Sequence, residues 1–436
     1  MYREAMERLV GWKSLDRRKP MIVYGLRQTG KTWLVEEFGK DHFEKMVTIN
    51  MEDSRFHAAF TNKTDPNSIL KTLSVLLGET IDASALIFFD EIQECPEALA
   101  SLKYFFEKRP DVFVVAAGSL LGVTSKQGRK FPVGKVDGLT LRPMNFREFL
   151  TAIGKEKIAD AIKNYDTATI DSVSTDITEL LRTYMLVGGM PEAVLTYAET
   201  GDIFSVRKVQ DELLNHYLSD MSNHPPKNII PHMKAVWDSI PAQLSKDSGR
   251  KFVYSLMKSK GGAAVYMAPI LWLCDYGLLT MVTKISKPGN PLKAYEDKKS
   301  FKLFAADVGL ICAKSGLDPK VVVDGDRMFT EFKGALTEQF AMQELIASDR
   351  KLYYWTADNS DGEIDLITEV DGKAIPIEVK AGENLKAKSL SAFRDRYDVE
   401  TSVRTSLSGS RDEGWMINIP LCAIGSLETA LAKRKG

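Results

Sequence analysis

The chain has 436 residues, more than one hydrophobic core usually serves, and we expect about two to four domains. Its 58 lysines and arginines nearly balance its 59 aspartates and glutamates, which leaves a net charge of −1. No global field therefore points to a nucleic acid or a membrane, and any basic surface must be local. The four cysteines lie far apart and form no C-x-x-C pair, which argues against a disulfide framework or a zinc site.

The hydrophobic segments do not suggest membrane insertion. The first residues, MYREAMERLVGWKSL, are charged and amphipathic, with no apolar signal region. The most hydrophobic stretch begins at Val265 and is interrupted by Pro269, Asp275 and Gly277, which argues against a membrane span. We therefore expect a soluble, cytoplasmic protein with no membrane partner.

The segment PMIVYGLRQTGKTWLVEEF, which starts at Pro20, predicts a phosphate-binding loop. Met21–Tyr24 is typical of a short buried strand, and a helical pattern follows the loop. The loop itself has the pattern G-x-x-x-x-G-K-T and consists of Gly25, Leu26, Arg27, Gln28, Thr29, Gly30, Lys31 and Thr32. The backbone N–H groups of such a loop cradle phosphate oxygens at the positive end of a helix dipole. We expect Lys31 to reach the β- and γ-phosphates and Thr32 to ligate Mg²⁺.

Two further buried strands support this site. ALIFFDEI at 85–92 ends near Asp90 and Glu91, and VFVVAAGS ends at Ser119. An aspartate at this strand end can hold Mg²⁺ through water, and the next carboxylate can polarise an attacking water. The Ser119 hydroxyl could touch the γ-phosphate or that water. Together with a strand at 46–52, these segments alternate with helical ones, which predicts a parallel α/β sheet with its ligand at the carboxyl ends.

These motifs resemble the AAA-type ATPase core. The resemblance implies that the loop is the Walker A motif, Asp90 the Walker B aspartate, Glu91 the catalytic glutamate and Ser119 the sensor 1 residue. It also implies ATP and Mg²⁺ as cofactors. One departure is that no arginine finger is clear, since Arg129 and Lys135 are the nearest candidates and a solvated basic loop explains them equally well.

The resemblance extends over nearly the whole chain, to prokaryotic AAA-type ATPases fused to an uncharacterised C-terminal domain (domain of unknown function 4143). LTLRPMNFREFL (139–150) belongs to the resemblance to the AAA-type core, and the segments that extend it are TYMLVGGMPEAVLTY (183–197), FKLFAADVGLICAKSG (301–316) and FTEFKGALTEQFAMQEL (329–345), together with the end of the chain. The biological role of that family is itself poorly defined, so the resemblance says more about architecture than about purpose.

The middle of the chain is predicted to be helical. Residues 156–228 show few strand signals, and we expect them to form the small helical lid of the ATPase. The sequence from Gly188 to Pro191 is predicted to end one helix and start another, as a hinge would. The segment SNHPPKNIIP at 222–231 is a proline-bearing linker and marks the next boundary.

A basic segment follows this linker. Its pattern of helix, Gly-Gly turn, helix and two strands predicts a winged helix-turn-helix. Residues 250–302 contain ten lysines and arginines against three acids, a local net charge of +7. Clustered lysines suit contact with phosphates more than the reading of bases, so DNA or RNA is the expected partner. The alternative of a winged helix that packs as a spacer, with solvated lysines, stays open.

Near the end of the chain, GEIDLITEVDGKAIPIEVKAG predicts a β-hairpin with Asp371-Gly372 as its two-residue turn. In that register Asp365 lies directly opposite Glu378, at a position where side chains approach closely. Lys380, two residues after Glu378, emerges on the same face. Two opposed carboxylates repel each other, so a divalent cation or a lysine must offset the repulsion.

The arrangement Asp…Glu-x-Lys resembles the PD-(D/E)XK nuclease fold, in which a preceding helix often adds a glutamate. Glu338 occupies that place in the sequence. The resemblance implies a Mg²⁺ site made by Glu338, Asp365 and Glu378, with Lys380 stabilising an anionic transition state. The alternative is a salt bridge of Lys380 on a solvated sheet face, with Glu338 exposed and no catalysis.

The predicted fold class is α/β, with a P-loop AAA-type parallel sheet and helical lid, then a winged helix, then a small PD-(D/E)XK-like domain. The predicted boundaries are 1–155 for the core, 156–227 for the lid, 228–325 for the winged helix and 326–436 for the last domain. We expect an ATP-driven, nucleic-acid-associated switch or effector that hydrolyses ATP with Mg²⁺. The alternative is a signalling or assembly ATPase whose last domain is an inactive protein-interaction module. A homo-oligomer is left open.

Overall fold

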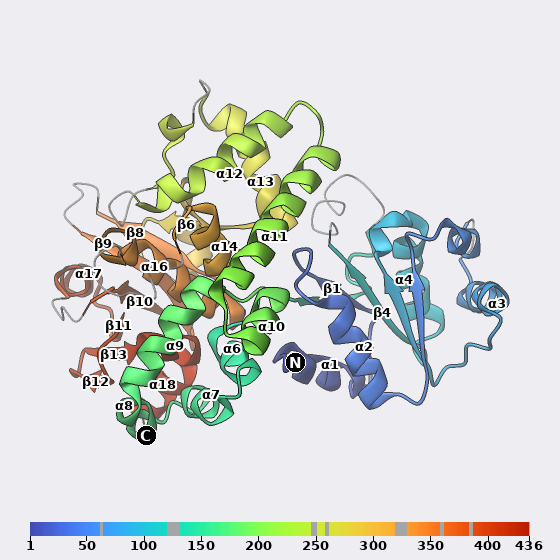
Figure 1. Cartoon of the computed structure of the whole chain (residues 1–436), viewed down its shortest axis with the longest axis horizontal. Helices are drawn as coiled ribbons and strands as arrows, with labels where there is room; N and C mark the ends of the chain where they lie inside the picture. Colours follow the sequence, from blue (N-terminus) through green and yellow to red (C-terminus); the bar gives the residue numbers. More distant parts are fainter. Residues whose placement is uncertain are drawn as a thin grey trace. The chain divides into compact units, whose positions relative to one another are not determined.

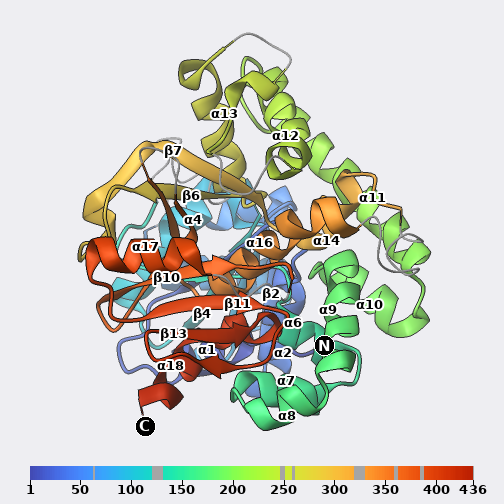
Figure 2. The same ribbon diagram turned by 90° about the vertical axis from the view of Figure 1, so that its left-hand side faces the viewer.

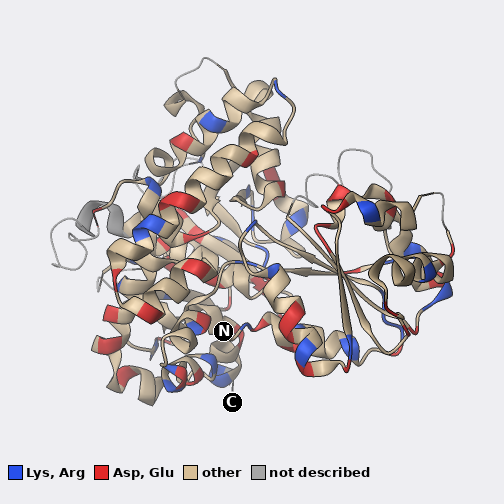
Figure 3. Ribbon diagram, turned by 45° about the vertical axis from the view of Figure 1, so that its right-hand side comes forward, with Lys and Arg blue, Asp and Glu red and all other residues tan. Residues whose placement is uncertain are grey.

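The chain divides into two compact units. The computed structural model describes residues 1–61, 64–119, 131–245, 251–257, 261–318, 329–357, 362–382 and 387–435. The first unit comprises Met1–Arg142 with Asp275–Gly277, and the second comprises Pro143–Cys274 and Leu278–Gly436. Within the described ranges no helix is both long enough and apolar enough to span a membrane. Acidic and basic residues are interspersed along the helices of both units, in keeping with the small net charge (Figure 3).

The first unit is built on a five-stranded sheet with the strand order β2-β3-β4-β1-β5. Its strands are β1 (Met21–Tyr24), β2 (Met46–Asn50), β3 (Leu86–Asp90), β4 (Phe113–Gly118) and β5 (Asp137–Thr140). All neighbouring pairs are parallel. The parallel α/β sheet predicted for this part of the chain is therefore confirmed, and the carboxyl ends of β1, β3 and β4 meet at one edge.

Helices cover both faces of this sheet (Figure 1). They are α1 (Ala5–Lys13), α2 (Lys31–His42), α3 (Pro66–Leu77) and α4 (Pro96–Lys108), with 3₁₀ turns at Ser54–Ala59 and Ile92–Glu94. Successive residues of β1 point to opposite faces, as the strand period of two requires. Met21 and Val23 pack with α1 and α2, whereas Ile22 packs with α3 and α4. The sheet is thus buried on both sides, which explains its unbroken apolar strands.

The second unit begins with six helices, of which the first lies in the segment predicted to belong to the ATPase core (1–155) and the other five lie in the region 156–228 that was predicted to be helical. They are α6 (Phe146–Ala152), α7 (Glu156–Lys163), α8 (Thr167–Ser172), α9 (Ser174–Val187), α10 (Pro191–Thr200) and α11 (Ile203–Asn223). We expected the last five to serve as the lid of the ATPase core, but the structure groups all six with the C-terminal half of the chain. The physical reason is an aromatic cluster in which Phe146 and Tyr184 pack edge-on against Phe340, at 6.1 and 5.8 Å between ring centroids.

The rest of the second unit surrounds an eight-stranded sheet with the order β12-β13-β11-β10-β9-β8-β6-β7. Its strands are β6 (Leu279–Ile285), β7 (Glu296–Ala305), β8 (Tyr353–Thr356), β9 (Glu363–Val370), β10 (Lys373–Val379), β11 (Ser402–Ser406), β12 (Arg411–Asp412) and β13 (Met416–Pro420). The helices are α12 (Ile230–Ser245), α13 (Ala263–Tyr276), α14 (Val308–Lys314), α16 (Phe329–Ala347), α17 (Lys388–Tyr397) and α18 (Leu427–Lys435), with 3₁₀ turns at Tyr254–Leu256, Leu292–Tyr295 and Leu421–Ser426. Both parallel and antiparallel pairs occur, so this sheet is mixed.

The two strands predicted as the wing of a separate winged helix belong to this larger sheet (Figure 2). Strand β6 pairs antiparallel with β7 on one side and parallel with β8 on the other. The helix predicted after the Gly-Gly turn and the two strands are present as α13, β6 and β7, whereas the described residues just before that turn form only the 3₁₀ turn at Tyr254–Leu256. The predicted boundary near 325 nevertheless runs through one continuous sheet, because the free edge of β6 is taken up by β8.

The hairpin predicted from Asp371-Gly372 is confirmed. Lys373 pairs with Val370 and Ile377 with Leu366 across β9 and β10, which is the expected register. Both turn residues have positive φ, +50° and +72°, as a tight hairpin turn of this kind requires.

A buried carboxylate fastens the predicted hinge from Gly188 to Pro191. Asp307 is fully buried, caps α14 by accepting from the Leu310 N–H at 2.9 Å, and also accepts from the Gly189 N–H. A Cβ on Gly188 would lie 2.1 Å from the Asp307 Oδ1, so only glycine fits there. Burial raises the pKa of Asp307 to about 6. The glycine pair therefore ends one helix at a closely packed contact.

We expect Asp307→Ala to lower the free energy of unfolding of the second unit by about 2–4 kcal/mol. It removes a helix cap, worth about 1 kcal/mol, and leaves a buried N–H without its acceptor, which costs about 1–3 kcal/mol. Hydrogen exchange of the Gly189 and Leu310 amides in the full chain measures the effect. Asp238→Ala, which breaks an exposed pair with Lys314, is the matched control and should cost less than about 1 kcal/mol.

Candidate nucleotide site and carboxylate cluster

The loop after β1 has the backbone conformation that a phosphate cradle needs. Gly25 and Gly30 have φ values of +152° and +85°, and Gln28 has a φ of +66°. A Cβ on Gly25 would lie 2.3 Å from the carbonyl oxygen of Leu141, so this position admits glycine alone. Gly30 directly precedes the first turn of α2, which places the amino end of that helix at the loop.

Lys31 is almost fully buried beneath this loop, with 6% of its surface exposed. Its Nζ donates hydrogen bonds to the carbonyl oxygens of Gly25 at 3.0 Å and Leu26 at 2.9 Å. Burial lowers the pKa of Lys31 to about 8, against the attraction of Glu91 and Asp90. The ammonium group is thus desolvated and held at the loop by two weak neutral acceptors, for which a phosphate is a far stronger substitute.

Thr32 and Asp90, the two protein ligands expected for Mg²⁺, lie next to each other in the structure. The Thr32 Oγ1 donates to the Asp90 Oδ2 at 2.9 Å, and the Glu91 N–H donates to the other carboxylate oxygen at 3.0 Å. Burial raises the pKa of Asp90, and the bond from Thr32 opposes this rise. A hydroxyl and a carboxylate oxygen are donors that Mg²⁺ prefers, so the residues fit this ion. Bound there, it would neutralise charge on the phosphates.

Glu91 is positioned by two polar side chains. Its φ of +46° is unusual for a side-chain-bearing residue and turns the chain sharply after β3. The Glu91 Oε2 accepts from the Gln93 Nε2 at 2.6 Å and lies 3.5 Å from the Ser119 Oγ. The structure therefore brings Asp90, Glu91 and Ser119 to one edge of the sheet, as the sequence predicted.

Two residues at this site were missed by the sequence analysis. Gln93 follows Glu91 by only two positions, and this closeness in the sequence was the signal that could have identified it. Arg3 is buried and donates to the carbonyl oxygens of Thr29 at 2.8 Å and Arg142 at 2.6 Å, which ties the loop to the chain after β5. No local pattern marks Arg3, because its partners lie far along the chain. Of the arginine-finger candidates, Arg129 lies outside the described residues, and Lys135 pairs with Glu107 at 2.9 Å.

A second group of charged residues lies on β7, β9, β10 and α16, and we call it the carboxylate cluster. Its members are Lys302, Glu338, Glu363, Asp365, Glu378 and Lys380. As predicted, Asp365 and Glu378 lie on adjacent strands, and the Asp365 Oδ2 accepts from the Val379 N–H at 2.7 Å. The Lys380 Nζ lies 2.6 Å from the Glu378 Oε1. Glu378 is buried, and its Oε2 has no hydrogen-bond partner.

Lys302 lies at the centre of the cluster, and the sequence did not predict that it belongs there. Its Nζ lies 2.8 Å from the Glu338 Oε1 and 2.8 Å from the Glu363 Oε1. Burial disfavours its charge, but Glu338, Glu363 and Asp365 together raise the pKa of Lys302 above its ordinary value. Burial and the nearby Glu338 raise the pKa of Asp365. Glu338 is thus a buried, paired residue, and the alternative of an exposed Glu338 does not hold.

The three carboxylates predicted as a metal site are engaged by the protein itself. Glu338 pairs with Lys302, Asp365 accepts a backbone N–H, and Glu378 pairs with Lys380. Over the residues that the structure describes, no three His, Cys, Asp or Glu side chains are arranged so that they could hold a metal ion. These residues therefore do not fit a divalent cation in the manner that the nuclease resemblance implies.

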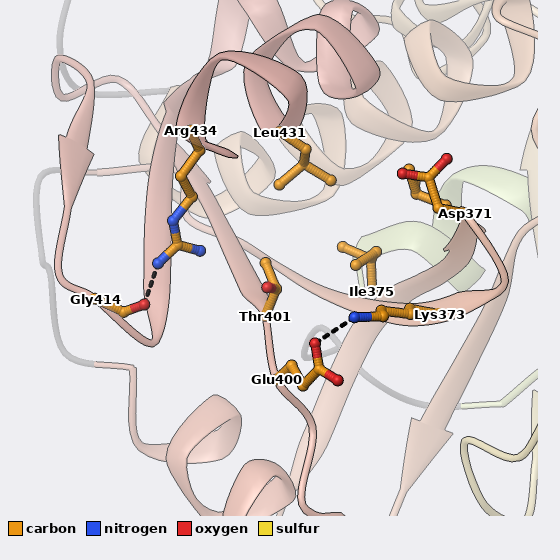
Figure 4. Close-up of a pocket in the computed structure, with 9 residues that line it drawn as sticks. Asp371, Lys373, Ile375, Glu400, Thr401, Gly414, Leu431 and Arg434 are labelled. Carbon is orange, nitrogen blue, oxygen red and sulfur yellow. Dashed lines mark hydrogen bonds and ion pairs between the residues drawn. The ribbon is translucent and has the colours of Figure 1, made fainter. Parts of the chain in front are cut away.

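A pocket of about 270 Å³ lies on another part of the second unit (Figure 4). Ile375 and Leu431 form apolar parts of its lining, and Lys373 and Arg434 bring cations to it. Lys373 pairs with Glu400 at 2.5 Å, and Arg434 pairs with Asp412 at 2.9 Å. By the strand period, Lys373 and Ile375 point away from the face of β10 that carries Glu378. The pocket is therefore separate from the carboxylate cluster, and its cations are neutralised within the protein.

Comparison with protein families agrees with this geometry. Residues 17–150 match the AAA domain, residues 178–321 match the domain of unknown function 8612, and residues 333–422 match the domain of unknown function 4143. The chain is thus a P-loop protein with an AAA domain. More particularly, it joins that AAA domain to a C-terminal domain of the 4143 family. None of these matches names a PD-(D/E)XK nuclease, and that resemblance stays a prediction.

Among solved structures, a Walker-type ATPase of Pyrococcus abyssi is 15% identical over 71% of this chain and 94% of that chain, with a TM-score of 0.43. The Orc1 protein of Aeropyrum pernix, solved in complex with DNA, is 15% identical over 72% and 91%, with a TM-score of 0.27. Cdc6p of Pyrobaculum aerophilum is 11% identical over 74% and 93%, with a TM-score of 0.25. Similarity this low carries no argument about partners. No curated protein matches the sequence.

We expect Thr32→Val to weaken Mg²⁺-dependent nucleotide binding by about tenfold or more, because valine keeps the shape of threonine but lacks the hydroxyl. Thr32→Ser keeps the hydroxyl and is the matched control. Titration of each variant with a fluorescent ATP analogue, with and without Mg²⁺, measures the effect. Equal Mg²⁺ dependence in Thr32→Val and wild type would contradict the assignment of Thr32 as a ligand.

Proposed function

We propose that the chain binds ATP with Mg²⁺ at the loop from Gly25 to Thr32 and hydrolyses it. The observation that carries the proposal is the convergence of Lys31, Thr32, Asp90 and Glu91 at one sheet edge. Within it, the Thr32–Asp90 bond of 2.9 Å joins the two expected Mg²⁺ ligands. Glu91, on a sharp turn, lies beyond them.

Each residue then has a distinct role. Lys31 exchanges its two carbonyl partners for the β- and γ-phosphates, and Thr32 and Asp90 hold Mg²⁺, directly or through water. Glu91 accepts a proton from the attacking water as a general base. Gln93 and Ser119 hold the Glu91 carboxylate, and either polar group can contact the water or the γ-phosphate. Hydrolysis at such a site serves as a conformational switch.

We expect Lys31→Ala to weaken ATP binding roughly tenfold to hundredfold, because it removes a charge-assisted bond to phosphate worth about 1.5–3 kcal/mol. Lys40→Ala is the matched control, since Lys40 lies on the same helix with 73% of its side chain exposed. Isothermal titration with ATP and Mg²⁺ measures the difference. Unchanged affinity in Lys31→Ala would place the nucleotide elsewhere.

Glu91→Gln should keep ATP binding and slow hydrolysis by about 10²–10⁴-fold, because the amide preserves shape but cannot act as a base. Glu94→Gln makes the same charge change at an exposed position three residues away and should hydrolyse at the wild-type rate. Phosphate release under saturating ATP measures the rate. A wild-type rate in Glu91→Gln would remove Glu91 from the mechanism.

A second candidate function is contact with a nucleic-acid backbone, and we infer it from the surface of β7. This strand forms one edge of the eight-stranded sheet, and Lys298 and Lys299 on it are exposed, as is Lys293 just before it. Exposed lysines of this kind suit phosphate contact. Lysines also protect an edge strand from pairing with other chains, and that account predicts no binding. Lys302 is buried and takes no part in this surface.

We expect the double variant Lys298→Glu and Lys299→Glu to bind DNA and RNA more weakly. It should also reduce the slope of log affinity against log salt by up to about 2, because each lost phosphate contact removes about 0.9. The matched control is Lys155→Glu with Lys157→Glu, which makes the same change of charge at exposed positions on another part of the unit. No binding by wild type at low salt would favour the edge-protection account.

A further inference from the structure

The carboxylate cluster contains a cation that belongs to the protein. Lys302 on β7 is 6% exposed, and its ammonium group makes ion pairs of 2.8 Å with both Glu338 and Glu363. It also lies 5.1 Å from the centre of the Tyr354 ring, on the neighbouring part of the sheet. Three stabilising contacts, two ion pairs and one cation–π contact, therefore converge on one buried ammonium.

We infer that Lys302 is the permanent cation of the carboxylate cluster and takes the place that the nuclease resemblance gives to a divalent metal ion. The cluster is then a metal-independent structural centre of the second unit. It follows that the cluster itself contributes no site for a divalent ion. The inference does not depend on the proposed hydrolysis of ATP.

Charge is the first reason. Glu338 is the residue of α16 that the metal site would need, and its Oε1 is already 2.8 Å from the Lys302 Nζ. A divalent ion at Glu338 would stand within a few ångströms of that ammonium, where like charges in a poorly solvated site repel strongly. Lys302 cannot move into solvent without leaving two buried or half-buried carboxylates uncompensated, which is costly.

The remaining carboxylates also have partners of their own. Glu378 is paired with Lys380 at 2.6 Å, and Asp365 accepts the Val379 N–H at 2.7 Å. The Glu378 Oε2 is buried and has no hydrogen-bond partner. Mg²⁺ takes about six oxygen ligands, and over the described part of the chain no three His, Cys, Asp or Glu side chains are arranged so that they could hold a metal ion. Lys302 and Lys380 therefore supply the positive charge that a bound metal ion would otherwise bring to the cluster.

The decisive experiment is titration of the full chain with Mn²⁺ alone, without nucleotide, followed by electron paramagnetic resonance. Wild type and Asp365→Asn should bind the same amount of Mn²⁺, because the cluster holds none. Addition of EDTA should leave the thermal unfolding of wild type unshifted. Binding of one Mn²⁺ by wild type that is lost in Asp365→Asn would overturn the inference.

A second arm tests Lys302 itself. Lys302→Met should lower the Tm by on the order of 10 °C, because it leaves buried carboxylates without their cation. Adding Glu338→Gln to that variant should restore part of the loss. Lys299→Met, on the exposed part of the same strand, is the matched control and should leave the Tm unshifted. If Lys302→Met unfolds at the same temperature as Lys299→Met, Lys302 is not the cation of the cluster.

Discussion

A charged group that is removed from water must find a partner inside the protein, and this constraint shapes each of the sites described above. Lys31 is buried under the phosphate loop and is held by two backbone carbonyls. Lys302 is buried in the second sheet and is held by two carboxylates. Asp307 is buried between helices and is held by backbone N–H groups. The kind of partner decides what each group can do next.

The two lysines show this difference most clearly. The partners of Lys31 are neutral carbonyl oxygens, and burial lowers its pKa. An incoming phosphate would therefore stabilise the charged form of Lys31 more strongly than these carbonyls do. The partners of Lys302 are charged, and they raise its pKa, so any new ligand would have to break a satisfied arrangement. The first lysine is therefore suited to binding, and the second to holding a structure together.

The same constraint bears on how the chain is divided. The helices after Pro143 carry aromatic and polar groups whose partners lie on α14 and α16, as with Tyr184, which accepts from the Gln343 side chain at 2.8 Å. The Phe146 N–H likewise donates to the Glu344 carboxylate at 2.8 Å. Contacts of this kind bind the helical segment to the C-terminal sheet. An AAA domain is thereby followed by one large second unit, to which the predicted lid, wing and terminal domain all belong.

The sequence alone determined the features that depend on local pattern. The loop from Gly25 to Thr32, the strand ends at Asp90 and Ser119, and the hairpin turn at Asp371-Gly372 were predictable, because spacing and a strand period of two fix them. The hairpin register in turn predicted that Asp365 lies opposite Glu378, and the structure has the two residues on adjacent strands.

Only the tertiary structure decided which distant charges meet. Lys302 appeared in the sequence as one of ten basic residues in a segment, and nothing local distinguishes it from the exposed Lys298 and Lys299. It is buried because β6 joins β8 as well as β7, which brings β7 into the same sheet as β9. Pairing between strands so far apart in the chain depends on the packing of whole surfaces. For that reason the partner of a carboxylate such as Glu338 could not be predicted from its neighbours in the sequence.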